Sequence, residues 1–135
     1  MATLKFFAVL LVFASFAVTA QQRDGLEPPT VVSLLSMELH DIPGKEALMI
    51  TVEYPPGGGD PVHRHDAHAF VYVLEGSIIM QVKGGKRLTL TQGQTYYEGP
   101  DDLHTVGQNA SSTKPAKFLV LLVKDIGVAP VLPAE

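Results

Sequence analysis

Short β-prone runs separated by glycine and proline turns fill the chain from Val31 onward, and this spacing most constrains the fold. Residues 77–82 and 87–90 flank Gly84-Gly85, a pair typical of a hairpin turn. No segment has a convincing helical period, so the pattern predicts an all-β sandwich or barrel. Residues 116–125 can also be read as a helix, but their β-branched content favours a strand. The expected strands are 31–40, 46–54, 69–75, 77–82, 87–90, 94–98, 103–108 and 116–125.

The first 20 residues differ from the rest of the chain. Lys5 is their single charge, an apolar stretch follows at 6–18, and small residues lead to Ala20. This order is typical of a secretory signal peptide cleaved after Ala20, with an uncleaved anchor as the alternative. The apolar stretch is shorter than the roughly 20 residues that a membrane-spanning helix needs. We therefore expect a secreted or periplasmic protein with no stable membrane insertion after cleavage.

The remainder is expected to form one domain, residues 31–125. Residues 21–30 are predicted to be a flexible lead-in or a first edge strand, and 126–135 a C-terminal tail that is loose or a terminal edge. The net charge is −4 and no basic run occurs, which argues against a nucleic-acid partner. The chain has no cysteine, so disulfides cannot stabilise it. Its core must hold it together, alone or with a metal or a dimer partner.

Three of the five histidines lie close together, in the stretch HRHDAH that starts at His63. In an extended segment alternate side chains share a face, so His63 and His65 can point the same way. Two such imidazoles suit a divalent Fe, Mn, Ni, Zn or Cu ion. His68 breaks this parity and faces away unless a bulge at 66–67 turns it inward. His104, at the start of another expected strand, is the obvious third ligand.

Apolar and aromatic residues are the candidate walls of a pocket beside these histidines. Val71 and Val73 share the inward parity, and Met80 and Tyr96 lie on other expected strands, although core packing explains each of them equally well. Either Tyr96 or Tyr97 faces inward, and the sequence leaves open which. The candidate substrate-binding residues are Tyr96, Val71 and Met80. No catalytic residue is identified, because no serine has a plausible nucleophile context.

These residues resemble the first motif of the cupin superfamily, G-x5-HxH-x3,4-E-x6-G. Gly57 is followed by five residues and then by His63-Arg64-His65, and Gly76 stands at the expected end. The resemblance implies a double-stranded β-helix, or jelly roll, of a small single-domain cupin. It covers about residues 31–125.

A second cupin motif, G-x5-PxG-x2-H-x3-N, is also recognisable. Gly93 and five residues lead to the stretch GPDDLH, which ends at His104, and Asn109 comes one place late. The PxG element is degenerate here, GPD at 99–101. The resemblance implies that His63, His65 and His104 are the metal ligands.

The glutamate of the first motif is missing, since Ala69 occupies its position. Three neutral imidazoles leave a divalent ion its full charge, which favours an anionic, bidentate oxygen ligand and O2. Alternatively, His68 fills the vacancy and makes a four-histidine site. Glu98 is another donor from a nearby strand, unless it is an ordinary sheet-surface carboxylate.

The resemblance implies a metal-dependent dioxygenase-type oxidoreductase that acts on a small chelating substrate. It also implies a homodimer, formed by strand exchange. Two alternatives stay open. One is a non-catalytic cupin that binds a metal or a small ligand. The other is a sugar isomerase-type enzyme, which usually needs a general base beside the site, and the vacancy at Ala69 argues against it.

Overall fold

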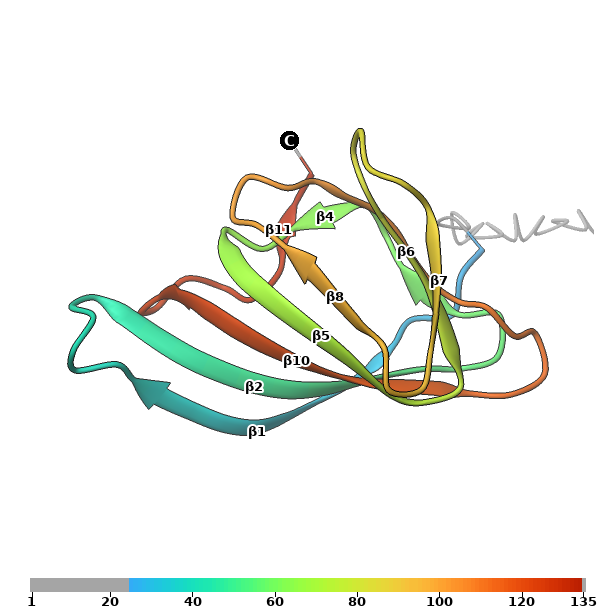
Figure 1. Cartoon of the computed structure of the whole chain (residues 1–135), viewed down its shortest axis with the longest axis horizontal. Helices are drawn as coiled ribbons and strands as arrows, with labels where there is room; N and C mark the ends of the chain where they lie inside the picture. Colours follow the sequence, from blue (N-terminus) through green and yellow to red (C-terminus); the bar gives the residue numbers. More distant parts are fainter. Residues whose placement is uncertain (1–24, 135) are drawn as a thin grey trace, which may run out of the picture.

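The computed structural model describes residues 25–134, which fold into two facing antiparallel β-sheets and the loops that connect their strands (Figure 1). The first sheet has the strand order β1-β2-β10-β5-β8, and the second has the order β11-β4-β9-β6-β7, with β3 paired to β9. No helix occurs among these residues, so the all-β prediction is confirmed. The strands are β1 (Thr30–Glu38), β2 (Lys45–Tyr54), β3 (Gly59–Asp60), β4 (His63–Arg64), β5 (Ala67–Glu75), β6 (Ser77–Val82), β7 (Leu88–Thr91), β8 (Thr95–Glu98), β9 (His104–Asn109), β10 (Ala116–Asp125) and β11 (Leu132–Pro133).

The hydrophobic core lies between the two sheets and follows from the two-residue period of the strands. Along β5 the inward residues are buried and the intervening ones are exposed up to Val73, whereas β10 alternates between buried and half-buried residues. β10 lies between β2 and β5, so residues 116–125 form a central strand and not a helix. The buried hydrophobic residues are Ile50, Val52, Tyr54, Ala67, Ala69, Val71, Val73, Ile78, Met80, Leu90, Ala116, Phe118, Val120 and Leu122.

The segments on either side of the predicted domain both contact it. The predicted signal peptide and residues 21–24 of the lead-in lie outside the described residues. Further along the lead-in, the carbonyl of Glu27 accepts a hydrogen bond from the amide of Gly59 at 3.0 Å. In the C-terminal tail, Leu132–Pro133 pairs with His63–Arg64 as β11. The tail is therefore an edge strand, and it lies against the first histidine of the motif.

No helix in the range 25–134 is long and apolar enough to cross a membrane.

Candidate metal centre

The second sheet brings two of the predicted ligands together. His63 on β4 and His104 at the start of β9 are direct partners across the two strands, and both are buried. His65 comes immediately after β4 and two residues after His63, so its side chain returns to the same face as that of His63. The backbone of Asp66 then adopts a left-handed conformation, with φ of 47°, before β5 begins at Ala67.

The three imidazoles converge as the sequence spacing predicts. The Nε2 atoms of His63 and His65 are 3.2 Å apart, and Nδ1 of His104 is 3.4 Å from Nε2 of His63. One ring nitrogen from each histidine lies within 4.8 Å of the other two. This group can hold a metal ion.

The other nitrogen of each ring is fixed by a backbone carbonyl. A carbonyl oxygen only accepts hydrogen bonds, so each of these nitrogens carries the proton. In a neutral ring the opposite nitrogen then presents its lone pair to the cluster, which is the tautomer that a metal ligand requires. The three bonds run from His63 Nδ1 to Pro61 (2.8 Å), from His65 Nδ1 to Pro130 (2.6 Å) and from His104 Nε2 to Val106 (2.6 Å).

Burial favours the neutral, metal-binding form of two of the imidazoles, those of His65 and His104. It lowers the pKa of His104 to about 3, and the neighbouring His63 contributes to the same shift. Burial also lowers the pKa of His65 below its ordinary value. Three lone pairs that face one another repel unless a cation lies between them. The nitrogen donor set therefore fits a divalent transition metal.

Two acidic side chains lie beside the imidazoles. Glu98, on β8, is buried, and its Oε2 is 3.7 Å from Nε2 of His65 and 3.6 Å from Nδ1 of His104. Burial raises the pKa of Glu98 to about 7, with contributions from the charges of Asp102 and Asp60. From the sequence, Glu98 was predicted only as an alternative metal donor, because the sequence does not reveal which strand lies next to β5.

Asp60 was missed by the sequence analysis. It lies on β3, where its carboxylate accepts a hydrogen bond from the hydroxyl of Tyr54, and burial raises its pKa. Asp60 lines the same small cavity as His63 and His65. Its place just before the HxH motif was the available signal, but the glycine-rich stretch around it indicated only a loop.

His68 does not join the cluster. It is exposed on the opposite face of β5, where its Nδ1 lies 2.7 Å from the hydroxyl of Tyr97. Strand parity resumes at Ala67 after the irregular Asp66, so no inward rotation of His68 occurs. The structure therefore does not support the four-histidine alternative.

A small cavity of about 30 Å³ adjoins the histidines. Of the predicted substrate-binding residues, Val71 and Met80 line it. Tyr96 does not line it and packs, half-buried, against the core, while Tyr97 is exposed on the outer face of the sheet. The full lining is Val52, Tyr54, Asp60, His63, His65, Val71, Met80, Glu98, His104, Phe118 and Val120.

Gly107 gives the ring of His104 its space. A Cβ atom at this position would lie 2.8 Å from the hydroxyl oxygen of Tyr54 and 2.9 Å from Cε1 of His104. Any larger residue at position 107 would displace one of the two rings.

Two residues further along β9, the side-chain amide of Asn109 donates hydrogen bonds to the carbonyls of Pro55 (3.0 Å) and Lys114 (2.8 Å). These bonds connect the loops at this end of the sheets.

A family model described as a cupin domain matches residues 50–122. The chain belongs to the cupin family. Its fold is similar to that of an uncharacterized conserved protein with a double-stranded β-helix domain from Klebsiella pneumoniae, with a TM-score of 0.62 and 15% identity over 83% of this chain and 89% of that one. The predicted double-stranded β-helix is confirmed.

Two other similar structures carry names that describe an activity. The DMSP lyase DddQ from Ruegeria pomeroyi is 26% identical over 64% of this chain, with a TM-score of 0.56, but this chain covers only 42% of its length. The polyketide cyclase RemF from Streptomyces resistomycificus is 21% identical over 75% of this chain and 72% of its own, with a TM-score of 0.55. No curated protein sequence matches this cupin at a significant level.

The buried carboxyl group of Glu98 predicts an unusual pH dependence of the metal-free protein. Because its folded-state pKa is raised to about 7, its contribution to stability is complete below about pH 4.5 and is lost as the pH rises through about 7. The amide of Glu98→Gln cannot ionise. We expect the metal-free variant to match the metal-free wild type near pH 4.5 and to exceed its free energy of unfolding by about 3 kcal/mol at pH 8.

Urea unfolding in the presence of a chelator measures this difference at both pH values. The titration of groups remote from position 98 is common to the two proteins and cancels in the comparison. An equal difference at pH 4.5 and pH 8 would contradict the prediction.

Proposed function

We propose that this protein is an exported cupin that binds a divalent transition metal through His63, His65 and His104 and acts as a dioxygenase-type oxidoreductase on a small chelating substrate. The observation that carries the proposal is the convergence of three imidazole nitrogens whose outer N–H groups are fixed by backbone carbonyls. The signal-like residues 1–20 support export.

A bound transition metal supplies a Lewis acid for oxygen ligands and, in its redox-active forms, electrons for O2. Val71 and Met80 give the cavity an apolar wall that limits the access of water. A dioxygenase adds both atoms of O2 to its substrate, so the reaction needs no external reductant. A cavity of about 30 Å³ holds roughly two water-sized groups, so we propose that only the chelating oxygens enter it. The rest of the substrate would lie at the side of His65, the most exposed of the three imidazoles.

Metal uptake tests the histidine ligands. We expect His63→Ala to lose stoichiometric metal, because a buried ligand and its fixed lone pair are removed. His68→Ala is the matched control, since His68 lies on the opposite face, and it should take up metal like the wild type. Elemental analysis of untagged protein after loading measures both. Equal metal content in the two variants would contradict the proposal.

The reaction type is tested by O2 consumption. We expect Fe(II)-loaded protein to consume O2 with at least one compound from a panel of catechols, diketones and flavonoids, in proportion to the substrate lost. The His63→Ala variant under the same conditions gives the background. Tight metal binding without turnover of any compound would favour the non-catalytic alternative, a cupin that binds a metal or a small ligand.

A second candidate function is proton transfer of the isomerase or lyase type. The observation that favours it is the carboxylate of Asp60, hydrogen-bonded to Tyr54, which supplies a candidate general base where position 69 offers none. The partial similarity to the DMSP lyase is consistent with it. Such a reaction proceeds without O2, so turnover that is unchanged under anaerobic conditions would replace the dioxygenase proposal with this one.

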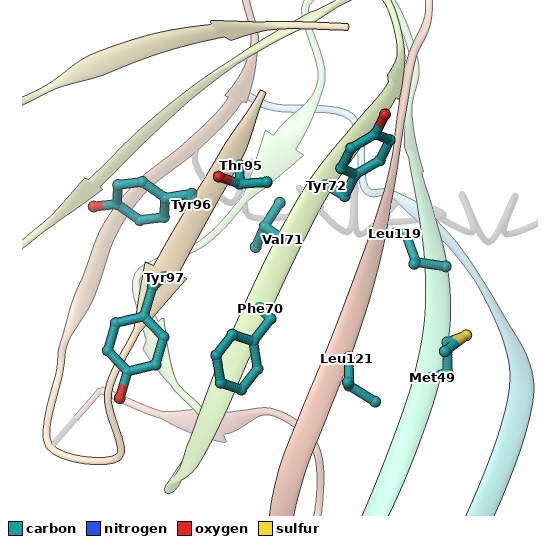
Figure 2. Close-up of a pocket in the computed structure, with 9 residues that line it drawn as sticks. All are labelled: Met49, Phe70, Val71, Tyr72, Thr95, Tyr96, Tyr97, Leu119 and Leu121. Carbon is teal, nitrogen blue, oxygen red and sulfur yellow. The ribbon is translucent and has the colours of Figure 1, made fainter. Parts of the chain in front are cut away.

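We also propose that the protein is a homodimer that uses the outer face of the first sheet. This face carries an apolar groove of about 630 Å³, to which β2, β5, β8 and β10 all contribute (Figure 2). No charged side chain lines it. Its lining residues are Met49, Phe70, Val71, Tyr72, Thr95, Tyr96, Tyr97, Leu119 and Leu121.

The edge strand β1 extends this apolar face. All nine of its residues are exposed, and Leu35 pairs directly with Met49 at the rim of the groove. Contiguous exposed apolar residues are typical of protein interaction sites, and an open strand edge is itself a site for pairing. A second copy of the chain presents the same uncharged groove and the same edge, so a two-fold dimer buries both at once. The large hydrophobic residues exposed on β1 are Val31, Val32, Leu34, Leu35 and Met37.

A charge placed in the groove should separate the dimer. We expect the wild type to have the mass of a dimer and Phe70→Glu that of a monomer, because the new carboxylate would be buried without a partner. Leu88→Glu is the control, since Leu88 is similarly exposed but lies on β7 of the other sheet. Light scattering coupled to size-exclusion chromatography gives both masses. A monomeric wild type, or a dimeric Phe70→Glu variant, would contradict the proposal.

A further inference from the structure

The carboxylate of Glu98 has an oxygen atom without a partner. Among the described residues, Oε2 of Glu98 is the one buried side-chain oxygen or nitrogen that makes no hydrogen bond. The residue itself is 2% exposed, so solvent does not compensate for the missing bond. A buried polar atom in this condition costs free energy unless something else binds it.

The neighbours of that oxygen atom are the metal-facing nitrogens. Oε2 lies 3.7 Å from Nε2 of His65 and 3.6 Å from Nδ1 of His104, and both distances exceed that of a hydrogen bond. The proton of each ring is already donated on the other side, to the carbonyls of Pro130 and Val106. Neither imidazole in this tautomer therefore has a proton to offer Glu98, and a shared cation satisfies all three acceptors together.

Asp60, the other acidic residue at the cavity, differs from Glu98 because its carboxylate has a hydrogen-bond partner. One of its oxygens accepts the hydroxyl proton of Tyr54. Glu98 is thus the acidic side chain at the cavity that has an unsatisfied oxygen facing the imidazoles.

The strand register places Glu98 opposite the position where the cupin motif has its glutamate. Ala69 on β5 and Glu98 on β8 are direct partners across the two antiparallel strands, and both are buried. Directly opposed residues of such a pair project on the same face of the sheet. Glu98 therefore enters the interior beside the methyl group of Ala69, where a larger side chain at 69 would compete for the same space.

We propose that Glu98 is the fourth protein ligand of the metal centre, supplied by β8 in place of a glutamate on β5. The inference rests on the proposed metal binding by His63, His65 and His104. One carboxylate leaves a divalent ion with a net charge of +1 in the centre, so the site retains a weaker preference for anionic ligands than a centre of three histidines alone.

Metal affinity in charge variants tests this ligand. In calorimetric titrations with Zn²⁺, we expect Glu98→Gln to bind at least about tenfold more weakly than the wild type, since even the loss of a supporting partner costs about 10- to 100-fold. Glu75→Gln is the matched control, because Glu75 is an exposed glutamate at the end of β5. It should bind like the wild type. The absorption spectrum of bound Co²⁺ should change in Glu98→Gln and not in Glu75→Gln.

Moving the carboxylate across the strand pair is a stricter test. The double variant Ala69→Glu/Glu98→Ala should recover most of the affinity that Glu98→Gln loses, because the two positions share a face. Crystals of the wild type soaked in Zn²⁺ give a measurement that depends on no variant. Anomalous scattering should place the ion about 2.0–2.2 Å from a carboxylate oxygen of Glu98.

The outcomes separate this inference from the proposed function. A Zn²⁺ ion bound by the three histidines but more than about 3 Å from Glu98, or unchanged affinity and Co²⁺ spectrum in Glu98→Gln, would overturn the fourth ligand and leave the metal centre intact. A wild-type protein that takes up no metal would overturn the proposed function itself.

Discussion

The fixed orientation of three imidazole rings is the constraint on which the site depends. Their outer nitrogens donate to carbonyls in three separate segments: the loop before β4, the strand β9 and the tail after β10. The tail is held in turn by the buried ammonium of Lys124, which pairs with Glu46 on β2 and donates to the carbonyl of Val128. The direction of a single lone pair on His65 thus depends on contacts made by both sheets, and not on the HxH motif alone.

Much of this arrangement could be predicted from the sequence, because two local signals were strong. Alternation along residues 63–73 gave the inward face, including the position of His65, but it left open whether a bulge turns His68 inward. Glycine and proline turns gave the strand boundaries to within a few residues. The role of His104 needed more than local pattern, since it depends on the pairing of β4 with β9, and the resemblance to the cupins supplied that pairing.

The rest could not be predicted because it depends on register between distant segments. Alternation indicates that Tyr96 and Glu98 share a face, but not that β8 lies beside β5 with Glu98 opposite Ala69. The carbonyl of Pro130 carries no side-chain signal at all. The exposure of strand β1 is another feature that the sequence does not reveal. Its apolar content resembles that of a core strand, and its full exposure follows only from its place at the edge of the sheet.

The pairing of Ala69 with Glu98 has a consequence for how such interiors change during evolution. Two directly opposed residues of an antiparallel strand pair project into the same space. An acidic residue gained on one strand therefore makes an acidic residue at the opposed position dispensable. A sequence motif that covers one strand then shows a missing acidic residue, although the interior still contains one. A comparison of the residue pairs opposed across the two strands would recognise the two forms as equivalent.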